Sequence, residues 1–142
     1  MTCCRVGLLL VALLAGVDGA GDANDAALLK GSWRVVATEF NGKALPEESL
    51  RDRKIVFEGD RMLVYVGEEK KRTLTFRLDP KQKPKHIDLT QPDKDRSAQG
   101  IYALEKDELK LCYGEPGDPR PTTFASPEGK KVFLLVLRRE GR

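Results

Sequence analysis

Residue types that could carry out chemistry are few in this chain. His86 is the only histidine among 142 residues. A single histidine excludes a metal site built on a histidine pair, and it removes the usual general base for a serine or cysteine nucleophile. A lone histidine can ligate haem iron, but the charged run KPKHIDL around His86 favours an exposed strand edge instead. We therefore expect no catalytic residue, no cofactor and no enzymatic activity.

Two further patterns bear on the binding of ions or phosphates. The acidic run DLTQPDKD lacks the glycine and the terminal glutamate of a calcium-binding loop, and it carries a lysine among its acids. The glycines form no phosphate-binding pattern, and GEPGDP is typical of turns. The sequence therefore predicts neither a metal site nor a nucleotide site.

The amino-terminal segment has the pattern of a secretory signal peptide. MTCCR supplies a positive charge, and VGLLLVALLAGV supplies an apolar run that is shorter than the roughly 20 residues of a membrane-spanning helix. Small residues follow, so we place the signal peptide at residues 1–20 with cleavage near Ala20. The mature protein is then secreted or periplasmic and has no membrane span. Cys3 and Cys4 leave with the leader, so Cys112 has no disulfide partner, and without a nearby base its thiol is a weak candidate nucleophile.

The remaining length and charge suit one small domain. A mature chain of about 120 residues can build one core, and we place this domain at residues 28–139. Lysine and arginine number 25 against 22 acids, for a net charge of +3. The basic residues are spread among acids, as in EEKKR, so they are interpreted as solvated faces and nucleic acid binding is not expected. We expect a monomer.

Apolar residues alternate with a period of two in short runs that are separated by turn residues, which is typical of an all-β chain. The segment PEESLRDR after the first run predicts one short helix, and TQPDKDRSAQ (residues 90–99) is interpreted as a polar connection. Eight antiparallel strands in sequence order can remove their free edges by closing into an up-and-down barrel. The predicted strands are residues 32–40, 54–58, 61–66, 71–78, 85–89, 100–106, 108–113 and 131–139.

The only tryptophan marks one end of this barrel. Gly31 and Trp33 form a G-x-W pattern on the first strand, and lipocalin-like barrels close one end with such a tryptophan beneath an arginine of the last strand. Arg138 and Arg139 are the candidates. Strict alternation favours Arg139 as the residue that packs over the indole. Arg139 lies nearer the end of the chain, however, and we therefore expect Arg138 to have the larger role there. The alternative is that Trp33 is ordinary core in a β-sandwich.

An inward-facing Trp33 fixes which residues fill the barrel. Glu39 is the one charged residue that this alternation directs inward, toward the open end, where we favour a solvated rim position. Glu39, Tyr65 and Tyr102 are the candidate ligand contacts at the barrel mouth. The other predicted inward residues are Val35, Ala37, Ile55, Phe57, Met62, Val64, Val66, Leu74, Phe76, Leu78, Ile87, Leu89, Ile101, Ala103, Leu109, Leu111, Phe133, Leu135 and Leu137.

The chain also resembles a known family over most of its length. The blocks LLKGSWRVV, NGKALPEE, IVFEGD, FRLDP with KPKHIDLT, GIYALEKDELKLC and RPTTFAS are similar, in this order, to the small exported lipocalin-like domains of Planctomycetes, whose function is uncharacterised. The similarity runs from about Leu28 to Arg138. It implies a lipocalin-like barrel and export, and it brings no catalytic residue and no ligand.

Two functions remain open at this point. In the first, the exported barrel binds a small apolar ligand at its mouth. In the second, it is an interaction or structural module that engages an exported protein of the cell envelope through its outer surface. An apolar pocket open to solvent favours the first function, and a filled barrel with an exposed apolar patch favours the second.

Overall fold

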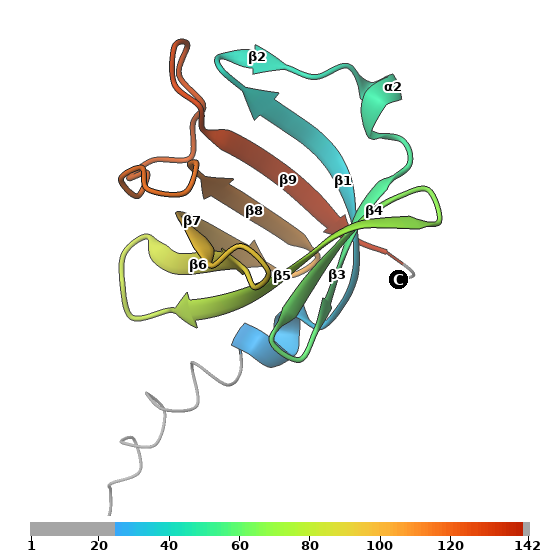
Figure 1. Ribbon diagram of the computed structural model, residues 1–142. Coiled ribbons are helices and arrows are strands. Elements are labelled where there is room, and N and C mark those ends of the chain that lie inside the picture. Colours follow the sequence, from blue (N-terminus) through green and yellow to red (C-terminus); the bar gives the residue numbers. More distant parts are fainter. Residues whose placement is uncertain (1–24, 141–142) are drawn as a thin grey trace, which may run out of the picture.

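The computed structural model describes residues 25–140, and the predicted signal peptide at residues 1–20 lies outside them. All eight predicted strands are present, together with one additional two-residue strand (Figure 1). The elements are β1 (Gly31–Phe40), β2 (Lys43–Ala44), α2 (Glu47–Leu50), β3 (Arg53–Glu58), β4 (Arg61–Val66), β5 (Glu69–Asp79), β6 (Lys85–Gln91), β7 (Arg96–Glu105), β8 (Glu108–Tyr113) and β9 (Phe133–Arg139).

The strands form a closed antiparallel up-and-down barrel, as predicted. From β3 to β9 each strand pairs with the next along the chain, and β1 pairs with both β3 and β9. The β1–β9 register runs from Trp33 opposite Arg139 to Phe40 opposite Phe133. Because both edges of the eight-stranded sheet are hydrogen-bonded to each other, the barrel has no long free edge. The predicted short helix after the first strand is confirmed as α2.

The segment predicted as a polar connection belongs largely to strands. β6 continues to Gln91 and β7 begins at Arg96, so residues 90–99 contain most of a hairpin. Thr90 and Ser97 face each other across this hairpin, with 2.8 Å between their hydroxyl oxygens. Polar cross-strand pairs stabilise a solvated ribbon without apolar alternation, which is why the periodicity of the sequence missed it.

A bulge in β1 changes which of its residues face the barrel interior. Opposite β9, the pairing passes from Val35 directly to Ala37, so one residue of β1 is unpaired. Beyond the bulge Thr38 pairs with the buried Leu135 and is itself only 4% exposed. The extra residue shifts the alternation by one position. The expectation that Glu39 faces inward is therefore wrong, because the bulge puts Thr38 inside in its place.

The inward face of β7 also differs from the predicted one. Tyr102 belongs to the interior cluster, whereas Ile101 and Ala103 were expected there. Ile101 is buried on the outer face instead, opposite Cys112 of β8. The Cys112 thiol donates to carbonyls of Thr123 and Ala125 in the connection between β8 and β9, at 3.5 Å each. Because this connection covers the outer face, both faces of β7 are apolar and alternation alone could not choose between them.

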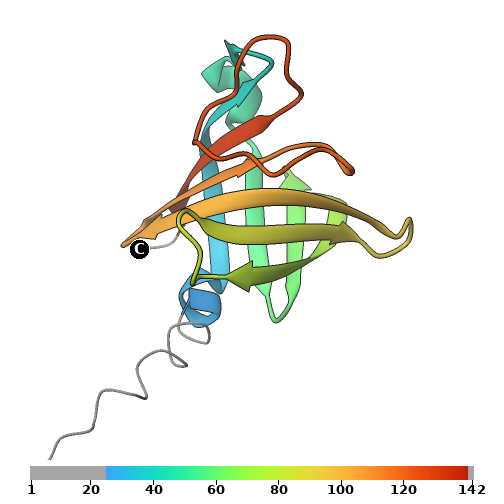
Figure 2. The ribbon, with the colours of Figure 1, turned by 90° about the vertical axis from the view of Figure 1, so that its left-hand side faces the viewer.

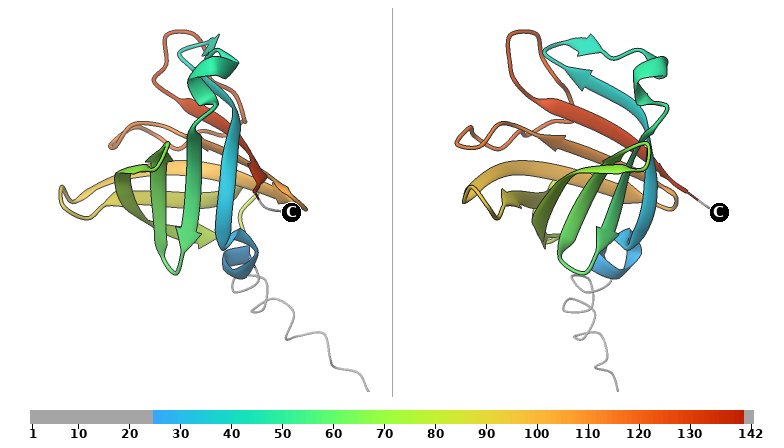
Figure 3. Two further views of the ribbon diagram at one scale, coloured as in Figure 1. Left: turned by 90° about the vertical axis from the view of Figure 1, so that its right-hand side faces the viewer. Right: turned by 45° about the vertical axis from the view of Figure 1, so that its right-hand side comes forward.

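The two ends of the barrel are covered differently. A helical turn over residues 25–29 lies against one end, near the start of β1 (Figures 1 and 2). The β1–β2 hairpin, α2 and the β8–β9 connection rise beyond the other end (Figure 3). These ends are called the base and the mouth.

Candidate functional site

Trp33 closes the base, as the G-x-W pattern predicts. Its side chain is 0% exposed, and its indole nitrogen donates to the Leu29 carbonyl at 2.8 Å. The guanidinium of Arg139 lies 4.2 Å from the centre of the Trp33 ring system. Arg138 points away from it, with a side chain that is 63% exposed. Arg139 is thus the stacking residue, as strict alternation requires, and the larger role expected for Arg138 is wrong.

Arg139 also ties the helical turn to the barrel. Its two terminal nitrogens donate to the carbonyls of Leu28, at 2.6 Å, and Lys30, at 3.2 Å. Asp107 lies 3.4 Å from Nε on the other side. Gly31 has a φ of +121°, a backbone conformation that L side chains rarely adopt. This glycine lets the chain turn from the helical segment into β1 beside the guanidinium.

Tyr102 belongs to the base and not to the mouth. Its hydroxyl donates to Asp25 at 2.6 Å, and Lys85 approaches the same carboxylate oxygen at 3.0 Å. Tyr102 is only 1% exposed. The folded domain therefore reaches Asp25, ahead of the boundary expected at residue 28. The sequence offered no signal for Asp25, because it lies in the polar stretch directly after the leader.

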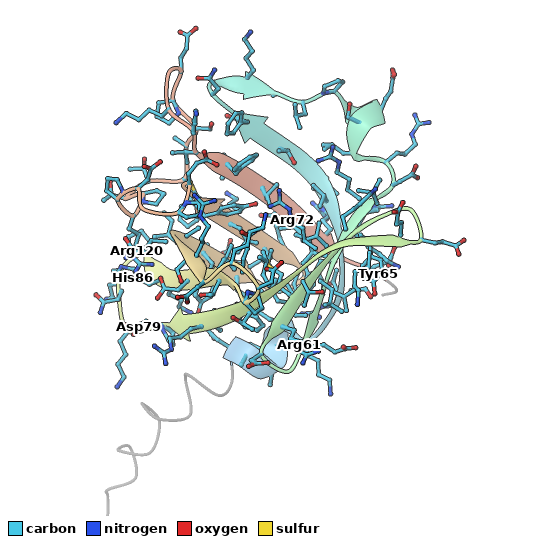
Figure 4. All side chains as sticks on the ribbon, in the orientation of Figure 1. Arg61, Tyr65, Arg72, Asp79, His86 and Arg120 are labelled. Carbon is cyan, nitrogen blue, oxygen red and sulfur yellow. The ribbon has the colours of Figure 1, made fainter. Side chains whose placement is uncertain are left out.

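Tyr65 lies on the outer face of the barrel. It pairs with Lys54 across β3 and β4, and the Lys54 ammonium lies 5.6 Å from the centre of the tyrosine ring. Lys54 stands next to the inward-facing Ile55, so both members of this pair face outward. Figure 4 shows Tyr65 at the periphery of the molecule. None of Glu39, Tyr65 and Tyr102 therefore lines the mouth.

A cavity of about 540 Å³ occupies the mouth end of the barrel. Its lower wall is apolar, and it opens between the ends of the strands. The apolar and aromatic lining residues are Val35, Leu45, Ile55, Met62, Val64, Val66, Leu74, Leu89, Ala98, Tyr113, Phe133 and Leu135. This volume lies within the range of about 300 to 1,000 Å³ that is usual for small-molecule sites.

One polar group in the cavity wall has no partner. The hydroxyl of Thr38 is buried and forms no hydrogen bond within residues 25–140. Leaving such a group unpaired costs about 1 to 3 kcal/mol. A hydrogen-bonding atom of a bound molecule would remove this cost.

An aromatic stack forms part of the cavity wall. Phe133 stacks on Phe40, with ring centres 4.3 Å apart, and on Tyr113, with ring centres 5.4 Å apart. Gly100 leaves room for this stack, since a Cβ atom there would lie 2.7 Å from Cβ of Tyr113. Burial raises the pKa of Tyr113 to about 12, although the charge of Arg72 acts in the opposite direction. The Tyr113 phenol is therefore neutral at physiological pH.

Basic residues surround the cavity opening. The cavity lining contains six basic residues, Arg53, Lys54, Lys71, Arg72, Lys94 and Arg96, and a single acid, Glu115. Of these, Lys54 belongs to the lining although its ammonium lies over Tyr65 on the outer face. Figure 4 shows Arg72 within the ring of strands. Sequence reasoning missed this group because its members come from separate runs, and each run also carries acids.

Two other titratable groups have shifted pKa values. A hydrogen bond from Gln82 lowers the pKa of Asp79, and the neighbouring His86 acts in the same direction. Burial raises the pKa of the Cys112 thiol. Within residues 25–140, no three His, Cys, Asp or Glu side chains are placed to share a metal ion, and no helix is both long and apolar enough to cross a bilayer.

Comparisons with known proteins add no relative. No family model, no curated protein and no solved structure matches the chain.

Proposed function

We propose that this domain is an exported, non-enzymatic binding protein that holds a small ligand with an apolar body in its barrel. The observation that carries the proposal is the cavity of about 540 Å³ with apolar walls. A barrel that served only as a scaffold would gain stability by filling this space, because unfilled volume forfeits packing contacts. The unpartnered hydroxyl of Thr38 supports the same function, since it leaves a hydrogen-bonding position for the ligand.

The alternative function, an interaction module of the cell envelope, has less support. Its surface would need a contiguous exposed apolar patch. In the part of the chain that the structure describes, the exposed large hydrophobic residues are Leu28 and Val66. They lie at different places, one beside the base and the other at the mouth.

A neutral fluorescent probe tests the proposed function. N-phenyl-1-naphthylamine brightens in apolar surroundings, and we expect saturable binding of one probe molecule per chain. Val64→Trp places a large ring in the cavity and should abolish binding. Thr73→Trp is the matched control, because Thr73 precedes the inward-facing Leu74 and therefore faces outward. Absence of saturable binding by the native protein, or equal binding by the two variants, would refute the proposal.

Native mass spectrometry then identifies the ligand. The protein is purified from its own host, and the mass of the complex is compared with that of the denatured chain. We expect one small molecule per chain, which the Val64→Trp variant should not retain.

A further inference from the structure

The arginines of the mouth are arranged around the cavity by the barrel itself. Arg53, Arg72 and Arg96 come from β3, β5 and β7, respectively. Each stands two residues ahead of a buried residue of the cavity wall, and side chains two apart in a strand share a face. The three pairs are Arg53 with Ile55, Arg72 with Leu74, and Arg96 with Ala98. Three guanidinium groups therefore stand on the inner face of the barrel, directly above its apolar wall.

These three arginines have no ionic partner in the described chain. The ion pairs within residues 25–140 leave all three out. Within residues 25–140, two of the six basic residues at the cavity form ion pairs: the outward-facing Lys54 with Glu140 at 4.0 Å, and Lys71 with Glu69 at 3.2 Å. Glu115 is the one acid of the lining, so the charges of the mouth are strongly unbalanced.

Tyr113, the titratable side chain on which the charge of Arg72 acts, does not compensate for this charge. Burial raises the pKa of Tyr113 to about 12, although the positive charge of Arg72 favours the ionised phenol. Tyr113 is therefore a neutral neighbour. Several like charges around one opening, in excess over the opposite charge, raise the local positive potential and attract anions. The planar guanidinium fork also matches carboxylate and phosphate oxygens.

We infer that the ligand of this cavity is an amphipathic organic anion, which inserts its apolar part into the barrel and leaves a carboxylate or phosphate group among Arg53, Arg72 and Arg96. This inference rests on the proposed function and adds the chemical class of the ligand. The apolar wall excludes a small inorganic anion as the whole ligand. The arginine group equally disfavours a purely apolar molecule, which would leave the charges of the mouth unpaired.

Displacement of the neutral probe by matched compounds tests the inference. Decanoate, decyl phosphate and decan-1-ol share one apolar chain and differ in head group. In low-salt buffer we expect the two anions to displace N-phenyl-1-naphthylamine at concentrations at least about tenfold lower than the alcohol. The order of decanoate and decyl phosphate identifies which head group the arginines prefer. Added salt should weaken both anions and leave the alcohol unchanged.

A pair of triple variants separates local recognition from total charge. Replacing Arg53, Arg72 and Arg96 by Gln should weaken the binding of the anions about tenfold or more, while the alcohol and the probe bind as before. The control replaces three exposed basic residues away from the cavity and removes the same charge. Its substitutions are Arg61→Gln, Arg77→Gln and Lys110→Gln.

The possible results distinguish the two proposals. If the alcohol and the anions bind equally well, or if the control weakens the anions as much as the arginine variant does, the inference about charge is wrong and the barrel remains a binder of apolar molecules. If the native protein binds neither the probe nor the alcohol nor the anions, the proposed function itself is wrong.

Discussion

Replacement of Arg139 should cost the domain much more stability than replacement of its neighbour Arg138. The Arg139 side chain is 14% exposed, stacks on Trp33 at 4.2 Å and donates to two backbone carbonyls. Arg138 is 63% exposed, and its only ion pair in the described chain is with Glu108 at 4.0 Å. The two residues thus provide a matched comparison within one strand.

The magnitudes follow from these contacts. A cation over a tryptophan contributes about 0.5 to 2 kcal/mol, depending on desolvation. Hydrogen bonds from charged donors contribute about 1.5 to 3 kcal/mol where they are buried. The two hydrogen bonds of Arg139 are partly open to solvent, so each should contribute an amount near or below the lower end of this range. Arg139→Ala should therefore lower the free energy of unfolding by roughly 2 to 4 kcal/mol. Arg138→Ala removes a surface pair and should change it by about 0 to 1 kcal/mol.

Urea unfolding followed by Trp33 fluorescence measures both variants. Trp33 is 0% exposed, so its emission reports the loss of the base directly. Arg139→Lys keeps the charge but loses the planar fork, and it should lie between the native protein and Arg139→Ala. Equal losses in the two alanine variants, or a native Trp33 emission typical of exposed tryptophan, would contradict this account of the base.

Two other predictions concern buried polar groups. Thr38→Val replaces the unpartnered hydroxyl by a methyl group. We expect the free energy of unfolding, measured in urea titrations, to rise by about 1 kcal/mol and the binding of the native ligand to weaken. A clear loss of stability would show that the hydroxyl has a partner in the free protein. Burial raises the pKa of Cys112, so the native thiol should react with iodoacetamide at pH 8 far more slowly than the unfolded thiol. Because the pKa of Cys112 is higher in the folded than in the unfolded protein, the contribution of this thiol to stability is complete below the ordinary thiol pKa and is lost as pH rises above it. Equal alkylation rates in urea and in buffer would contradict the burial of Cys112.

The strands and the base were predictable from the sequence because local patterns encode them. Short apolar or alternating runs mark the barrel strands, and turn residues such as Gly59 and Asp60 separate strands that pair in the structure. The single tryptophan near the start of the first strand then marked the closed end. Strict alternation from Leu137 also identified Arg139 correctly, and the preference for Arg138 failed because distance from the chain end does not decide which face a side chain occupies.

The mouth was not predictable, for three physical reasons. The bulge in β1 turns the side chain of Thr38 into the barrel in place of Glu39, and nothing in the run VVATEF marks an unpaired residue. The outer face of β7 is covered by a connection from elsewhere in the chain, so alternation could not place Tyr102. The arginines become neighbours only through the pairing of distant strands, and Arg96 lies in a hairpin without apolar alternation.

The two ends of the barrel use arginine in opposite ways, and this contrast supports the proposed function. At the base, the largely buried Arg139 guanidinium stacks on an aromatic ring, donates to two carbonyls and pairs with the Asp107 carboxylate, although its Nε forms no hydrogen bond within residues 25–140. At the mouth, Arg53, Arg72 and Arg96 form no ion pair within residues 25–140, and the buried hydroxyl of Thr38 in the lining of the same cavity forms no hydrogen bond there. A sequence selected only for stability would satisfy both ends, because each local choice would then agree with the fold. Three arginines without an ion pair at the mouth are expected where an anionic ligand pairs with them.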